Sequence, residues 1–61
     1  MNKTRRNRIS KAIDELRSIL NEEQDVYDNI PENLLDTDRA SESEEAINVL
    51  EDVIDQLEDI I

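Results

Sequence analysis

The sequence contains no cysteine, no histidine and no glycine, and it has a single proline, Pro31, and a single aromatic residue, Tyr27. Without cysteine the chain forms no disulfide, and without cysteine or histidine it lacks the ligands of a structural zinc site. A chain of 61 residues buries a modest fraction of its surface. A domain of this size therefore usually needs a disulfide, a bound metal or a partner subunit to be stable. We therefore expect helix packing, self-association or both to provide the stability.

Positive charge is almost confined to the beginning of the chain. The net charge is -10, and five of the seven basic residues stand at Lys3, Arg5, Arg6, Arg8 and Lys11, whereas all 17 acidic residues come later. An acidic body of this kind repels nucleic acid and anionic lipid. No apolar run approaches the roughly 18 residues of a membrane-spanning helix. We expect a cytoplasmic protein that does not associate with membranes and does not bind nucleic acid directly.

Residues 4–30 show the spacing of one long amphipathic helix. Ile9, Ile13, Leu16 and Leu20 step by four, three and four residues, and Tyr27 falls two steps further along the same stripe. This spacing lines the side chains along one face of a helix. A second row lies beside the first at seven-residue spacing and consists of Ala12, Ile19 and Val26. The pattern predicts a helix over about residues 4–29.

The second half of the chain repeats this pattern. Ile47, Leu50, Ile54, Leu57 and Ile61 step by three, four, three and four residues. The pattern predicts a second helix over about residues 38–61. The flanking row at seven-residue spacing consists of Ala46, Val53 and Ile60. Each helix thus has three apolar positions per heptad, which is a wider stripe than a two-stranded coiled coil requires.

Residues 30–37 separate the two helical patterns and predict a corner. Pro31 disfavours helical geometry at the preceding residue and suits the start of a new turn. Thr37, Asp38 and Ser41 each have a side chain that caps helix N-termini. Because the connection is short, the two helices are expected to lie antiparallel, as a hairpin in a single domain.

The first predicted helix contains the one acidic residue within the apolar stripe, Glu23, two turns before the corner. In a hairpin this residue lies near the start of the second helix, where backbone N–H groups or Arg39 would meet its carboxylate. Tyr27 is interpreted as covering the end of the core. The alternative is that the apolar residues of the corner are exposed together as a site for a partner. That possible corner site consists of Tyr27, Ile30, Leu34 and Leu35.

Antiparallel folding would also place the basic start of the chain beside its acidic end. Arg5, Arg6 and Arg8 would lie near Glu58 and Asp59 of the same chain. Each of these charges opposes the dipole of its own helix, so each would gain a compensating partner. Exposed pairs contribute little individually, about 0–1 kcal/mol, although several together help to set the orientation of the helices.

A single hairpin leaves part of each wide apolar stripe in water. Two hairpins that pair bury both stripes at once, so we predict an all-α antiparallel hairpin that dimerises into a four-helix bundle. A hairpin that folds only on another protein is the structural alternative. The predicted core and dimer interface consists of Ile9, Ile13, Leu16, Ile19, Leu20, Tyr27, Ile47, Leu50, Val53, Ile54, Leu57 and Ile61.

The composition gives little support for an enzyme active site or a metal site. There is no cysteine or histidine to act as nucleophile or base, and a helical bundle of 61 residues offers no obvious pocket. Asp36, Thr37 and Asp38 begin like a calcium loop, but the required glycine is missing and Ile47 stands where the bidentate glutamate belongs. We expect no enzymatic activity, no metal site and no cofactor.

Regularly spaced carboxylates cover one face of the second predicted helix. Such a surface imitates a row of phosphates and could occupy a basic nucleic-acid channel. The simpler interpretation is a solvated face that keeps a small bundle soluble. The possible partner-binding acidic face consists of Glu44, Glu45, Glu51, Asp52, Asp55, Glu58 and Asp59.

The segments EEQDVYDNIPENL and EEAINVLEDVIDQLEDII resemble a group of small acidic helical-hairpin proteins of Gram-positive bacteria and their phages. The shared features are an acidic E-E-Q, an aromatic-D-N-x-P-E-x-L corner and an E-A-I-x-x-L-E repeat. The corner positions are occupied here by Glu22, Glu23, Gln24, Tyr27, Asp28, Asn29, Pro31, Glu32 and Leu34. The resemblance implies a helical hairpin of phage or mobile-element origin that works in the host cytoplasm, and it brings no established activity.

Charge, size and this resemblance together predict a non-enzymatic protein–protein interaction module. Its expected action is to bind a host or rival protein, such as a component of a defence system, and to inhibit or modulate it. Two alternatives stay open. One is an acidic nucleic-acid mimic that occupies a basic channel, and the other is a transcriptional accessory that uses the basic N-terminal arm.

Overall fold

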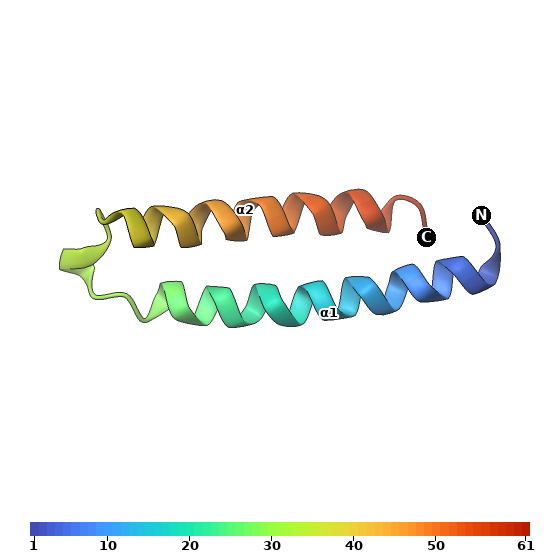
Figure 1. Ribbon diagram of the computed structural model, residues 1–61, viewed down its shortest axis with the longest axis horizontal. Helices are drawn as coiled ribbons and strands as arrows, with labels where there is room; N and C mark the ends of the chain where they lie inside the picture. Colours follow the sequence, from blue (N-terminus) through green and yellow to red (C-terminus); the bar gives the residue numbers. More distant parts are fainter.

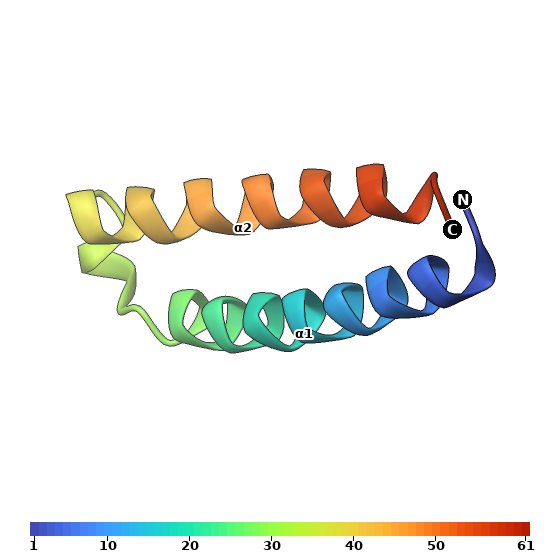
Figure 2. The same cartoon turned by 45° about the vertical axis from the view of Figure 1, so that its right-hand side comes forward.

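The computed structural model describes residues 1–61 as two long helices joined by a tight corner (Figure 1). Helix α1 spans Lys3–Asp28, a single 3₁₀ turn η1 spans Glu32–Leu34, and helix α2 spans Asp38–Glu58. The helices run antiparallel along each other, and both chain termini lie at the end opposite the corner (Figures 1 and 2). The predicted all-α helical hairpin is therefore confirmed.

Local sequence explains both ends of α1. At its start, the side chain of Asn2 accepts a hydrogen bond of 2.9 Å from the backbone N–H of Arg5, which caps one of the free donors of the first turn. At its end, Asn29 donates from both its backbone and its side chain to the carbonyl of Asp25. Pro31 follows in an extended conformation, which cannot continue the helix.

Thr37 provides the N-cap of α2, one of the three caps that the sequence allowed. Its hydroxyl accepts a hydrogen bond of 3.4 Å from the backbone N–H of Ala40 and donates one of 2.7 Å to the carbonyl of Leu34. The helix ends at Glu58, three residues before the predicted end. There the hydrogen bonds tighten to the i→i+3 spacing, with the N–H of Ile60 donating to the carbonyl of Leu57.

The two helices meet along a narrow seam. Its buried apolar residues are Ile13 on α1 and Ala40, Ile47 and Ile54 on α2. Half-buried residues extend the seam along both helices and consist of Ile9, Leu16, Leu20, Tyr27, Ile30, Leu50 and Leu57. Three residues of the predicted core and dimer interface, Ile19, Val53 and Ile61, are exposed in the hairpin. The seam alone therefore leaves part of the predicted apolar surface uncovered.

The hairpin is long and thin, with extents of 49 × 15 × 11 Å. Its radius of gyration is 14.5 Å, whereas a compact domain of this length has a radius of about 10.5 Å. Two helices in a single layer have no second layer to close over them, so each keeps one side of its surface open. Neither helix contains an apolar segment of the length that crossing a membrane requires.

Candidate interaction surface

One polar contact lies within the seam. The hydroxyl of Ser43 on α2 donates a hydrogen bond of 2.6 Å to a carboxylate oxygen of Glu23 on α1. Ser43 is 7% exposed, and no buried side-chain polar atom of the hairpin lacks a partner. The partners expected for Glu23, which were backbone N–H groups or Arg39, were therefore wrong. Ser43 falls between Ala40 and Ile47 in the apolar stripe, and this spacing could have identified it.

A row of apolar residues on each helix stands beside the seam. Ala12, Ile19 and Val26 each precede a seam residue of α1 by one position, so each is rotated by about 100° from that residue around the helix. Ala46 and Val53 have the same relationship to the seam residues of α2. Two facing antiparallel helices are related by an approximate two-fold axis normal to the plane of the hairpin. Equal rotations on the two helices therefore bring both rows to the same side of the plane of the hairpin.

We call this side the apolar face and define it by Ala12, Ile19, Val26, Ala46 and Val53. All five residues are exposed in the hairpin. The exposed fractions of the three large residues are 41% for Ile19, 45% for Val26 and 37% for Val53. Ile60, the last residue of the predicted row, lies in the turn that follows α2. Scattered single apolar residues are normal on a protein surface, whereas several exposed apolar residues gathered on one face are typical of an interaction site.

The seven residues of the predicted acidic face lie away from the apolar face. Glu44, Glu51, Asp55 and Glu58 each follow a seam residue by one position, so they are rotated from the seam in the opposite sense to the apolar rows. Glu45, Asp52 and Asp59 each follow one of these residues by one further position, which adds about 100° of rotation in the same sense. All seven residues are exposed. The helix geometry thus gives the hairpin an apolar face on one side and the predicted acidic face on the other.

The single ion pair of the hairpin joins α1 to α2 on the side of the acidic face. The guanidinium of Arg17 contacts the carboxylate of Glu58 and donates a hydrogen bond to it. Both residues follow seam positions, Leu16 and Leu57, which agrees with their meeting on this side. The ion pairs expected between the arginines of the first turns and the acidic end of α2 were wrong. Glu58 is already paired, and the first turns of α1 extend past the end of α2 (Figure 1).

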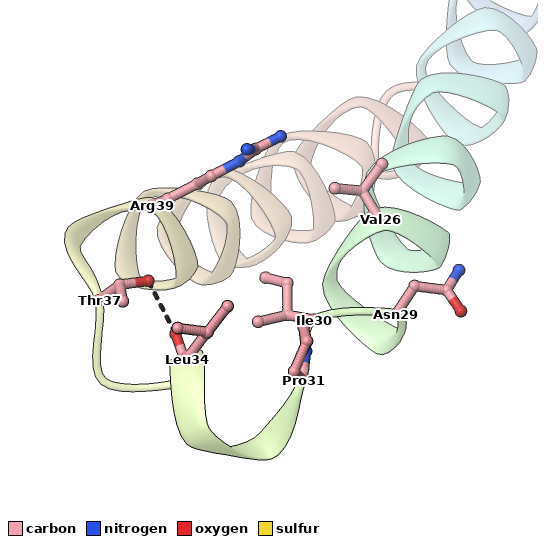
Figure 3. Close-up of a pocket in the computed structure, with 7 residues that line it drawn as sticks. All are labelled: Val26, Asn29, Ile30, Pro31, Leu34, Thr37 and Arg39. Carbon is pink, nitrogen blue, oxygen red and sulfur yellow. Dashed lines mark hydrogen bonds between the residues drawn. The ribbon is translucent and has the colours of Figure 1, made fainter.

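An open pocket of about 420 Å³ lies at the corner, at one end of the apolar face. Its lining residues are Val26, Asn29, Ile30, Pro31, Leu34, Thr37 and Arg39. Figure 3 shows the side chains of Ile30 and Leu34 directed toward each other and the side chain of Arg39 extended along α2. Arg39 makes no ion pair within the chain.

The structure divides the four residues of the possible corner site. Tyr27 and Ile30 are half-buried, and Tyr27 lies on the seam side of α1. Leu34 and Leu35 are 44% and 40% exposed, because the 3₁₀ turn projects from the end of the hairpin. The corner is therefore partly a packed end of the core and partly an exposed apolar tip.

The carboxylates do not converge anywhere on the hairpin. No three of them come close enough together to hold a metal ion. The residues of the calcium-loop resemblance, Asp36 to Asp38, lie across the start of α2, with Thr37 engaged as its cap. The exposed surfaces described above are thus the main features available for recognition.

No protein-family model matches the sequence, and neither the curated proteins nor the solved structures contain a match to it.

Proposed function

We propose that this protein is a non-enzymatic interaction module that pairs with a second copy of itself through the apolar face to form a four-helix bundle. The observation that carries the proposal is the apolar face, because it gathers the exposed rows of both helices on one side of the hairpin. Pairing two such faces removes the apolar rows of both copies from water, and burial of apolar surface is the main driving force of association.

The accessible surface of the chain supports this pairing. The hairpin exposes 4872 Å², whereas a compact monomer of its mass exposes about 4,100 Å² by the usual scaling. The excess of roughly 800 Å² equals the area that each partner buries in a standard protein–protein interface. A second copy of the hairpin presents the same rows in the same order, as a two-fold symmetric interface requires.

The acidic face would remain exposed in such a dimer and is proposed as the surface that meets another protein. It carries six carboxylates on α2 and a seventh at its C-cap, Asp59, and Arg17 alone neutralises one of them. A partner with a basic surface would be attracted to it and steered into contact. The resemblance to hairpin proteins of Gram-positive bacteria and phages supports a host or rival protein as the target, which the module would inhibit or modulate.

A nucleic-acid mimic is the second candidate, and the one-sided distribution of the carboxylates favours it. Glu44, Glu51 and Glu58 recur every seven residues, with further carboxylates on the next turns. A target that normally holds nucleic acid in a basic channel would then release it on binding this protein. Displacement of DNA from the target, lost in a variant with Glu51→Gln and Asp55→Asn, distinguishes the mimic from a module that binds elsewhere.

The molar mass in solution tests the dimer directly. Sedimentation equilibrium is expected to give twice the chain mass of 7.1 kDa. Val53→Glu places a charge in the middle of the apolar face and is expected to shift the mass toward that of one chain. The matched control is Asn48→Glu, which adds the same charge to an exposed position of α2 outside the apolar face.

Two results would contradict the proposal. The first is a wild-type protein that has the mass of one chain at all accessible concentrations. The second is an equal loss of association in Val53→Glu and Asn48→Glu, because added negative charge in general, and not the apolar face, would then control the mass.

A further inference from the structure

The two ends of the hairpin differ strongly in charge. The half nearer the corner, residues 16–47, contains ten acidic and two basic residues. The half nearer the termini, residues 1–15 and 48–61, contains seven acidic and five basic residues. The net charge is therefore concentrated at the corner end, and the molecule is electrically asymmetric along its long axis.

The basic residues of the terminal end have no acidic partner within the chain. The single ion pair of the hairpin joins Arg17 to Glu58, and none of the five bases in the first eleven residues takes part in one. The first turns of α1 extend past the end of α2, so no acidic helix of the same chain faces them (Figures 1 and 2). These charges are free to meet a second molecule.

The same asymmetry borders the apolar face. At its terminal end, Arg5 and Arg8 precede Ala12 by seven and four residues and so lie beside it on α1. At its corner end, Glu22 precedes Val26 by four residues, and Glu42 precedes Ala46 by four. By the same spacing, Glu15 borders the face at the terminal end and Arg39 borders it at the corner end. The charges that would line the edge of a dimer interface are thus mainly basic at the terminal end and mainly acidic at the corner end.

We infer that the two copies pair head-to-tail, so that the basic first turns of each α1 lie across the acidic corner end of the other copy. This inference rests on the proposed dimer and assigns its orientation. Apolar contact alone does not select an orientation, since both arrangements cover the same rows. Charge does select one, because complementary ends attract and like-charged ends repel across an interface.

The opposite arrangement, corner against corner, is disfavoured by the same charges. It places the ten acidic residues of one corner half beside the ten of the other and leaves the two basic arms next to each other. Like charges held side by side at an interface oppose association. The head-to-tail arrangement instead gives each acidic end the basic arm of its partner and leaves an acidic face exposed on each copy.

Spin labels distinguish the two orientations, because the chain has no cysteine of its own. Asn33→Cys labels the exposed corner and Thr4→Cys labels the exposed terminal end. In the head-to-tail dimer, two labels at the corner are separated by a distance close to the hairpin length of 49 Å. Two labels at the terminal end are similarly far apart. An equimolar mixture of the two variants adds a short distance between Asn33→Cys and Thr4→Cys of paired copies.

Pulsed dipolar spectroscopy measures these distances, and sedimentation of the labelled variants confirms that they keep the dimer mass. A short distance between two corner labels shows corner-against-corner pairing and overturns the inference while the proposed dimer stands. A mixture of short and long corner distances shows that charge selects no orientation and also overturns it. Labelled variants that sediment with the mass of one chain and give no dipolar signal, when the unlabelled wild type also has the mass of one chain, contradict the proposed dimer and its orientation together.

Discussion

Ser43 on α2 donates its hydroxyl hydrogen to the carboxylate of Glu23 on α1 across 2.6 Å, and this bond is the one polar link within the seam of the hairpin. A carboxylate in a half-buried position needs a donor, because its removal from water is costly. The serine supplies that donor from a position where the apolar stripe would otherwise continue. The pair therefore sets how the two helices align near the corner.

Removal of the serine hydroxyl is expected to destabilise the hairpin. Ser43→Ala leaves the Glu23 carboxylate without a donor from the protein, at a cost of about 1–2 kcal/mol in the free energy of unfolding. The double variant Ser43→Ala/Glu23→Leu replaces both polar groups and is expected to be at least as stable as the wild type. Urea titration followed by far-ultraviolet circular dichroism measures both. A double variant that is weaker than Ser43→Ala would refute the role given to the carboxylate.

The cap of α2 is expected to contribute measurably to stability. Thr37→Ala removes the acceptor for Ala40 and the donor for Leu34, and loss of such a cap costs about 1 kcal/mol. Thr37→Asp keeps the acceptor and lacks the donor, so its stability is expected to lie between the other two. Thermal unfolding of the three proteins in the same buffer tests this order, and equal midpoints for all three would contradict it.

A charge in the seam is expected to abolish the fold. Ile54 is 4% exposed, and burying an unpaired carboxylate there costs several kcal/mol, against the roughly 3–5 kcal/mol that so small a core supplies. Ile54→Asp should therefore lose its helical circular dichroism. Gln56→Asp, which adds the same charge to an exposed position two residues away, should keep it. Wild-type helicity in Ile54→Asp would show that the seam is placed wrongly.

The ion pair between Arg17 and Glu58 is expected to contribute little. Both side chains are more than 40% exposed, and exposed pairs contribute about 0.2–1 kcal/mol. A double-mutant cycle with Arg17→Ala and Glu58→Gln should give a coupling energy in that range, and added salt should reduce it. A coupling energy well above that range, unchanged by salt, would mean that the pair is shielded from solvent, as by a second copy lying over it.

Local features of the chain were predicted best from the sequence. Pro31 ends the first helix independently of the tertiary structure. Its ring removes a backbone N–H donor and restricts the backbone conformation of the preceding residue. Thr37 was among the three predicted caps, and the structure selects it. The end of α2 was less predictable, since the apolar spacing continues to Ile61 whereas the hydrogen bonds tighten after Glu58.

Contacts between the helices could not be predicted in the same way. The pairing of charges depends on how far each helix extends beside the other, and the spacing within one helix does not contain that offset. For this reason Arg17, and not Arg5, Arg6 or Arg8, meets Glu58. Glu23 likewise accepts a hydrogen bond from Ser43, a polar residue 20 positions away. A search for apolar residues alone does not single out this serine.

The sequence by itself determined that the chain forms two amphipathic helices with a corner between them, because periodicity, caps and proline act within a few residues. It also determined that each helix carries an apolar stripe too wide for one seam. Only the tertiary structure decided which part of each stripe is buried and which is left in water. That division depends on the relative rotation and offset of two antiparallel helices, and it brings the exposed rows together on a single face of the hairpin.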